Sequence, residues 1–267
     1  MLNLWLFGLM VVVSCTVVLW LVSLPLRDVS IVDSFWSLGF VISVWIFAGG
    51  LPSTGPQLVH ALAVTLWGVR LALHIAVRHH KAGREDHRYA TMRERAGAIF
   101  KWRSLVTVFI LQGLLIGVIG VPLLFSQAGE RPADWLLTDW IFLALFAVGL
   151  FFEAVGDWQL TRFKADPENK GKVLDTGLWR YTRHPNYFGD AVVWWSFWVA
   201  AIGSVNGIYT VPCALLMTVL LMRVSGVTLL EKTIVDRRPA YADYIARTSA
   251  FFPWPPKAAG DGAGGRP

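Results

Sequence analysis

Long apolar runs constrain the fold of this chain more than any other feature of its sequence. A helix needs about 20 consecutive apolar residues to cross the hydrocarbon core of a bilayer. Seven stretches approach or reach that length, at residues 4–26, 31–50, 58–78, 104–126, 136–156, 189–206 and 208–230. Only 16% of the residues are charged, against about 25% in soluble domains. The sequence therefore predicts an all-α, polytopic membrane protein with seven transmembrane helices.

The basic residues predict how these helices are oriented. Of the 24 Lys and Arg residues, eight lie within 78–103, six within 157–188, six after Leu230, and one is Arg27. With the N-terminus outside, all of these face the cytoplasm, and Arg131 is the only cation in an exterior loop. Cytoplasmic loops are normally the ones rich in Lys and Arg. We therefore expect an exterior N-terminus, a cytoplasmic C-terminus and a cytoplasmic ligand site.

Several other classes of protein and site are not expected. The first span lacks a basic start and a small-residue cleavage site, so we interpret it as a retained helix. Orientation accounts for the net charge of +6, so nucleic acid is not an expected partner. Cys15 and Cys213 lie in apolar runs and are expected to be buried, without a disulfide or metal. No zinc-ligand spacing, Rossmann fingerprint, P-loop or GxSxG motif is present.

The most polar motif is DTGLWRYTRHPNYFGD, from Asp175 to Asp190, which directly precedes an apolar run. Its polar and aromatic side chains include Arg180, Tyr181, Arg183, His184, Asn186, Tyr187 and Asp190. Pro185 disfavours helix in the residue before it, so we expect the next helix to begin at about Tyr187. The N–H groups at that helix start favour phosphate. The motif predicts a site for a charged, planar ligand at the membrane surface.

The segments on either side supply further candidates. Asp157 and Lys164 are seven residues apart and share a face if the fifth helix extends beyond the bilayer. Lys172 lies in a basic loop that suits either ligand phosphates or anionic lipid headgroups. Downstream, an amphipathic helix begins at Glu231 and carries Tyr244. That helix either docks at the membrane interface or covers the ligand.

Ionisable residues inside apolar spans are costly and usually face a cavity or a partner. Asp33 is such a residue, or else an ordinary helix-start residue beside Arg27. Arg70 lies midway along the third span, where it requires either an ion pair with Asp33 or an anionic ligand. The mixed-charge loop after this span is expected to be mostly solvated. Within it, Arg88 and Tyr89 are the residues expected to turn inward.

These motifs together resemble a known superfamily. GLWRYTRHPNYFGD, with DWQLTRFK upstream and YADYIARTSAFFPWPP downstream, resembles the steroid 5-alpha-reductases and sterol reductases. More narrowly, the chain looks like the bacterial DUF1295 family, which also shows VDxFW (Val32–Trp36) and LWGxRL (Leu66–Leu71). The same superfamily includes isoprenylcysteine carboxyl methyltransferases, which share a related turn but bind S-adenosylmethionine.

The resemblance implies a single seven-helix reductase domain over residues 1–255, with a cofactor-binding half at about 150–255. The Gly-rich residues 256–267 are expected to be disordered. Such an enzyme holds NADPH on the cytoplasmic side and transfers hydride to the C=C of a hydrophobic enone, steroid-like or another lipid, that enters from the bilayer. We expect a monomer in the bacterial inner membrane, in contact with membrane lipids and without a metal.

Residue by residue, the resemblance and the spacing assign two sets of side chains. The expected cofactor-binding residues are Arg70, Asp157, Lys164, Lys172, Tyr181, Arg183, His184, Asn186, Tyr187, Asp190, Glu231 and Tyr244. The expected catalytic residues are Asp33, Trp67 and Tyr89. The Gln-Glu pair of steroid 5-alpha-reductases is missing and Trp67 stands where they carry Tyr, which leaves the substrate open. A membrane methyltransferase and a non-enzymatic lipid-binding protein are the alternatives.

Overall fold

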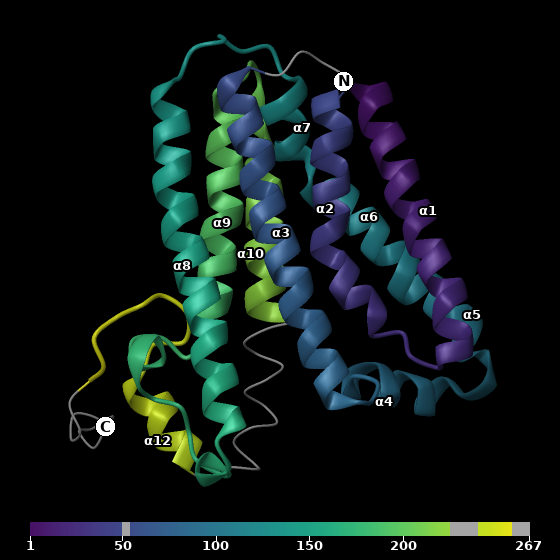
Figure 1. Ribbon diagram of the computed structural model, residues 1–267, viewed down its shortest axis with the longest axis vertical. Coiled ribbons are helices and arrows are strands. Elements are labelled where there is room, and N and C mark those ends of the chain that lie inside the picture. Colours follow the sequence, from purple (N-terminus) through teal and green to yellow (C-terminus); the bar gives the residue numbers. More distant parts are fainter. Residues whose placement is uncertain (50–53, 225–239, 258–267) are drawn as a thin grey trace, which may run out of the picture. The chain divides into compact units, whose positions relative to one another are not determined.

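In the computed structural model, residues 1–49, 54–224 and 240–257 are described, and within these ranges all regular structure is helical (Figure 1). Among the residues that the structure describes, five helices are long and apolar enough to cross a membrane: Leu2–Leu26, Ile31–Gly49, Gly55–Ala82, His87–Ile119 and Leu137–Ala165. The sixth expected span forms the helix Pro185–Ile202, and the seventh falls in the shorter apolar helix Gly207–Arg223. The predicted all-helical, multi-pass architecture is therefore confirmed, with five clear spans.

The helices of 18 residues or more are α1 (Leu2–Leu26), α2 (Ile31–Gly49), α3 (Gly55–Ala82), α8 (Leu137–Ala165) and α9 (Pro185–Ile202). The shorter helices are α4 (His87–Ala96), α5 (Phe100–Ser104), α6 (Leu111–Ile119), α7 (Val121–Ala128), α10 (Val211–Val219) and α12 (Ala240–Arg247), with π-helical turns at Leu105–Ile110 and Leu220–Val224. Short 3₁₀ turns occupy Gly97–Ile99, Pro167–Asn169, Gly177–Arg180 and Gly207–Thr210. The helix α8 extends past its predicted end at residue 156, so Asp157 and Lys164 both lie on it as expected.

The chain divides into two compact units. The first unit comprises Met1–Trp140 and Phe197–Cys213, and the second comprises Ile141–Ser196 and Ala214–Pro267. The expectation of a single domain over residues 1–255 stays a prediction. Each unit is described by itself below.

Close helix packing in the first unit depends on small residues. The helix α2 contacts both α1 and α3, and α1 also contacts α6. A side chain at Gly68 of α3 would meet the carbonyl oxygen of Ser37 at 3.0 Å. The Ser37 hydroxyl instead donates to the carbonyl oxygen of Gly68 at 2.8 Å. Small residues and interhelical hydrogen bonds are the usual means of helix association in lipid, so this contact fixes α2 against α3.

One loop of the first unit is fixed by a buried ion pair. We expected Arg131 to be an ordinary loop cation, but its guanidinium donates to both carboxylate oxygens of Asp139, at 3.0 and 2.7 Å. The two side chains are 1% and 0% exposed. The imidazole of His60 lies 3.0 Å from the same carboxylate. Because the charges are paired where water is excluded, the pair ties this loop to the start of α8.

Candidate functional site: two polar clusters in separate units

In the second unit, glycines bring the backbones of α8 and α9 together (Figure 1). A side chain at Gly149 would meet the backbone nitrogen of Val193 at 2.7 Å, and one at Gly156 would meet that of Asn186 at 3.1 Å. On α9, a side chain at Gly189 would collide with the backbone of Glu153. Only glycine permits this approach, and polar residues beside the glycines become buried between the two helices.

Those polar residues form the first cluster. Glu153, Asp157 and Asp190 are 2%, 6% and 8% exposed. The Asn186 side chain donates through Nδ2 to Oδ1 of Asp157 at 3.0 Å. Its amide oxygen is buried and has no hydrogen-bond partner among the described residues. A buried acceptor without a donor is costly in a finished structure, so Asn186 marks a position where a ligand N–H or O–H group would be favoured.

Glu153 is the member of this cluster that the sequence analysis missed. It lies one turn before Asp157 on α8, in an otherwise apolar stretch. A carboxylate inside a predicted span was the available signal, because such residues are rarely retained without a role.

The Pro-containing turn is built as the sequence indicates, although the helix starts earlier. The helix α9 begins at Pro185 rather than at Tyr187, because the fixed backbone angle of proline suits a first helical position. The ring of His184 stacks on that of Tyr187, with centroids 5.7 Å apart. Tyr181 is 43% exposed. His184, Tyr187 and Tyr181 are therefore clustered around the helix start, where their assignment to a cofactor stays a prediction.

Arg183 has a visible anchoring role in this unit. Its guanidinium donates to the carbonyl oxygens of Ile245 and Thr248, at 3.1 and 2.6 Å. Its backbone N–H donates to the carbonyl oxygen of Ser249 at 2.9 Å. The arginine thus binds the end of α12 to the motif. Its assignment to the cofactor stays a prediction.

Tyr244 fastens α12 to the same motif from the other side. Its hydroxyl donates to the carbonyl oxygen of Trp179, and the Trp179 indole in turn donates to the carbonyl oxygen of Gly156 at 3.1 Å. Burial and the neighbouring Tyr241 raise the pKa of Tyr244, so this hydroxyl keeps its proton. Arg247 adds an ion pair with Asp175 at 2.6 Å. The tail helix is therefore packed against the motif, and Glu231 lies outside the described residues.

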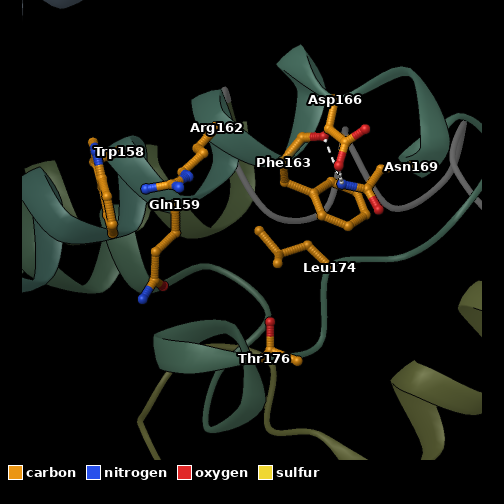
Figure 2. Close-up of a pocket in the computed structure, with 8 residues that line it drawn as sticks. All are labelled: Trp158, Gln159, Arg162, Phe163, Asp166, Asn169, Leu174 and Thr176. Carbon is orange, nitrogen blue, oxygen red and sulfur yellow. Dashed lines mark hydrogen bonds between the residues drawn. The ribbon is translucent and has the colours of Figure 1, made fainter.

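Exposed cations surround this polar cluster along the chain. The five that lie within 157–184 are Arg162, Lys164, Lys170, Lys172 and Arg180. A pocket of about 280 Å³ opens beside α8, lined by Trp158, Gln159, Arg162, Phe163, Asp166, Asn169, Leu174 and Thr176 (Figure 2). None of the predicted cofactor-binding residues lines this pocket. It is a separate feature of the second unit.

The second cluster lies in the first unit and centres on Asp33 of α2. Arg88 donates to Oδ2 of Asp33 at 2.7 Å, and the Tyr89 hydroxyl donates to Oδ1 at 2.6 Å. The expectation that Arg88 and Tyr89 turn inward from their loop is confirmed. The cation paired with Asp33 is thus Arg88, whereas from the sequence we had considered Arg70. All these contacts use the Asp33 carboxylate as an acceptor, and its expected catalytic role stays a prediction.

A capped helix places these two residues. The Asp86 carboxylate accepts from the backbone N–H and from Nε of Arg88, both at 2.9 Å, and so caps α4. Burial opposes ionisation of Asp86, but the hydrogen bonds from Arg88 outweigh it and lower the pKa of Asp86. The cap holds Arg88 in position, and Tyr89 follows on the first turn. The ring of Tyr89 is buried in a core with Trp20, Val32 and Phe109.

Gln112 completes this cluster and was not identified from the sequence. Its Nε2 lies 3.3 Å from the Tyr89 hydroxyl and 3.5 Å from Oδ1 of Asp33. The amide must direct its N–H groups toward the carboxylate, so its oxygen points away from it. That oxygen is buried without a partner among the described residues. The π-helical turn Leu105–Ile110 immediately precedes it, and such turns are frequent at functional sites.

The remaining predicted residues of the first unit lie on α3. Trp67 is fully buried, and its ring contacts those of Phe40 and Phe197 at centroid distances of 6.2 and 5.7 Å. Arg70 is partly buried one turn further along. The catalytic role expected for Trp67 and the cofactor contact expected for Arg70 stay predictions.

Comparison with known proteins decides the family. The sequence profile described as "Protein of unknown function (DUF1295)" matches residues 19–248, most of the chain. The chain belongs to the DUF1295 family. An uncharacterized protein of Schizosaccharomyces pombe is 26% identical over 261 residues, covering 88% of this chain and 76% of the relative.

A second relative matches over a shorter region. The protein named "Probable O-methyltransferase ustE", from Ustilaginoidea virens, is 43% identical over 63 residues. The match covers 23% of this chain and 21% of that protein. No solved structure matches.

Proposed function

We propose that this DUF1295 protein is a membrane-embedded reductase that uses NADPH to reduce the C=C of a hydrophobic enone. The observation that carries the proposal is the part-buried hydrogen bond between Asn186 and Asp157, beside which the buried amide oxygen of Asn186 has no donor among the described residues. The resemblance of the motif Asp175–Asp190 to the turn of steroid and sterol reductases supplies the cofactor. The steroid-like or other lipid nature of the substrate belongs to the same proposal.

The polar groups of the second unit fit a nicotinamide dinucleotide. A carboxamide offers N–H donors, which the Asn186 oxygen and the Asp157 carboxylate can accept. Asp190 lies one turn after Asn186 on α9 and provides another carboxylate for an amide or ribose hydroxyl. Lys164 and Lys172 are exposed and supply positive charge for phosphates. Bound there, NADPH supplies the hydride.

The Asp33 cluster supplies the proton in this proposal. Tyr89 carries a hydroxyl proton within a short hydrogen bond to Asp33, and we favour it as the donor to the substrate carbonyl. Arg88 holds the carboxylate in place on its other oxygen. General acid catalysis by a positioned side chain contributes about 10²–10⁴-fold to a rate. Asp33 then acts by orienting the tyrosine.

The proposal includes the complete topology. The protein has seven spans in a bacterial inner membrane. Its N-terminus lies outside, and its C-terminus and cofactor site lie on the cytoplasmic side. The distribution of Lys and Arg supports it. In a variant without Cys15 and Cys213, a cysteine placed at Asp134 should react with an impermeant reagent added to whole cells. A cysteine placed at Arg84 should react only after lysis, and the reverse pattern would overturn this orientation.

Calorimetry on the purified, detergent-solubilised protein tests the cofactor. We expect NADPH to bind, and Asn186→Leu to weaken that binding about tenfold or more, since a polar contact in a buried site contributes about 1–3 kcal/mol. Arg180→Gln, an exposed change outside the cluster, serves as the matched control and should bind like wild type. NADPH binding that is unaffected by Asn186→Leu would contradict the proposed site.

Methyl transfer is the second candidate, favoured by the 63-residue match to the probable O-methyltransferase. The same buried acceptors could hold the amino groups of S-adenosylmethionine. If calorimetry detects binding of S-adenosylmethionine but not of NADPH, the methyltransferase would replace the reductase as the proposed function. Binding of neither compound would favour a lipid-binding protein without enzymatic activity.

A further inference from the structure

The pocket beside α8 combines one cation, one carboxylate and two aromatic rings. Trp158 and Arg162 are four residues apart and lie on one side of α8, and Asp166 follows directly after the last residue of that helix (Figure 2). Phe163 and Leu174 form apolar walls between the two charged ends. These residues are distinct from the Asp157–Asn186 cluster. The pocket therefore has a ligand chemistry of its own.

The two charged side chains remain available to a ligand. The Arg162 guanidinium lies over the Trp158 ring at 5.6 Å from its centroid, and among the described residues it has no carboxylate partner. Asp166 accepts from the backbone N–H of Glu168 at 3.0 Å and from the Asn169 amide at 3.4 Å. A carboxylate offers about four acceptor positions, so Asp166 keeps capacity for one more donor. Arg162 and Asp166 do not neutralise each other.

The position of the pocket along α8 indicates where its ligand comes from. The apolar residues of this spanning helix run to Val155, and Trp158 follows within one turn. At 1.5 Å per residue, Trp158 lies about 4 Å beyond the apolar stretch and Arg162 about 10 Å beyond it. The Arg162 guanidinium reaches back over the Trp158 ring. Lipid headgroups occupy the layer just outside the hydrocarbon core, and tryptophan is common at that level. The guanidinium therefore lies near the level that lipid headgroups occupy.

We propose that this pocket binds the phosphoethanolamine headgroup of a membrane phospholipid. Arg162 binds the phosphate, which lies closer to the glycerol, and Asp166 accepts from the terminal ammonium group. Along the chain, the cation Arg162 comes before the carboxylate Asp166. In the headgroup, the negative phosphate likewise comes before the positive ammonium group, counted outward from the glycerol. A choline group has no N–H to donate, and a glycerol headgroup carries no positive charge for Asp166.

The size of the pocket also favours a headgroup. Its volume of about 280 Å³ is below the range of about 300–1,000 Å³ that is typical for drug-sized ligands. A small zwitterion suits it better than a dinucleotide. The proposal is independent of the enzymatic activity, and a reductase, a methyltransferase and a lipid-binding protein could each carry this site.

Native mass spectrometry of the detergent-solubilised protein tests the proposal. Phosphatidylethanolamine, phosphatidylcholine and phosphatidylglycerol with identical acyl chains would be offered in equal amounts. We expect phosphatidylethanolamine to be bound up to about fivefold more than either competitor, the upper end of the range for an exposed ion pair. Equal binding of the three lipids, or a preference for phosphatidylglycerol, would overturn the proposal.

Two variants separate the two ends of the headgroup. Asp166→Asn keeps the side-chain oxygen that caps the following turn and should reduce phosphatidylethanolamine binding to the level of phosphatidylcholine. Arg162→Gln should weaken both lipids alike, since both carry the phosphate. Arg180→Gln and Asp243→Asn change exposed charges elsewhere in the second unit and should leave the preference intact. A preference that survives Asp166→Asn would rule out the ammonium contact.

A soluble competitor identifies the source of the headgroup. Free phosphoethanolamine, added at the same concentration as the lipid, should displace little phosphatidylethanolamine because it lacks the acyl chains that hold the lipid beside α8. Displacement as effective as that by the lipid itself would assign the pocket to a soluble molecule instead of a membrane lipid.

Discussion

The first unit contains two carboxylates paired with arginines, and they differ in how completely they are enclosed. The Arg131–Asp139 pair is bidentate and almost fully buried, at 1% and 0% exposure. The Arg88–Asp33 pair is 41% and 19% exposed. Beside Asp33 lies Gln112, whose amide oxygen has no partner among the described residues. The Arg131–Asp139 pair is shielded from solvent, whereas the cluster around Asp33 contains a buried amide oxygen that could still accept a hydrogen bond.

This difference separates a structural role from a chemical one. A buried pair with complete geometry resists change, because removing either partner leaves an uncompensated charge in a medium of low polarity. A partly open cluster contributes less to stability and can accept a ligand, since water or substrate can reach its polar atoms. The closed pair should therefore dominate stability, and the open cluster should dominate activity.

The largest loss of stability is expected for Asp139→Asn. The change leaves the Arg131 charge buried without its counter-ion and should destabilise the protein by about 3–5 kcal/mol. The thermal unfolding midpoint in detergent measures the effect. Asp134→Asn changes an exposed carboxylate in the same loop and should shift the midpoint little. Equal midpoints for both variants would show that the buried pair is not structural.

Tyr89→Phe should instead abolish activity with a small loss of stability. Removing the hydroxyl deletes one hydrogen bond to Asp33, which costs about 1–3 kcal/mol at most, while the proposed reductase loses about 10²–10⁴-fold in turnover. NADPH oxidation with an enone that the wild type accepts measures the rate. Asp33→Asn should follow the same pattern, and full turnover in either variant would remove that residue from catalysis.

Gln112→Met should be close to neutral for stability. The two contacts of its Nε2 are long, at 3.3 and 3.5 Å, and the change removes a buried oxygen that has no donor. We expect a change of less than about 1 kcal/mol in the free energy of unfolding, as measured by thermal unfolding. A loss as large as that of Asp139→Asn would place Gln112 among the structural residues.

The smallest effect concerns pH. The pKa of Asp86 in the folded protein is lowered from 3.8, so the stabilisation of the folded state by its negative charge is fully present above pH 3.8. This stabilisation is lost as the pH falls below 3.8 and through the folded pKa. Asp86→Asn keeps the cap but not the charge, so the unfolding midpoints of wild type and variant should converge as the pH falls. A constant gap between pH 3 and 6 would contradict this role for the charge.

The helical, multi-pass architecture and the position of the polar motif could be predicted from local sequence properties alone. Apolar length and helix-start chemistry are local properties, which is why α2, α3 and α9 were predicted within a few residues. The inward turn of Arg88 and Tyr89 was also foreseen, because a tyrosine in a charged loop gains from burial.

Which polar residues meet depends instead on how the helices pack. Arg131 and Asp139 are separated by a loop whose path no periodicity reveals, and Gln112 lies 79 residues from Asp33. Glu153 becomes part of a site only because glycines on α8 and α9 allow the two backbones to approach. Pairing of charges in lipid depends on helix packing in three dimensions. A linear pattern therefore shows that a polar residue needs a partner, but not which partner it finds.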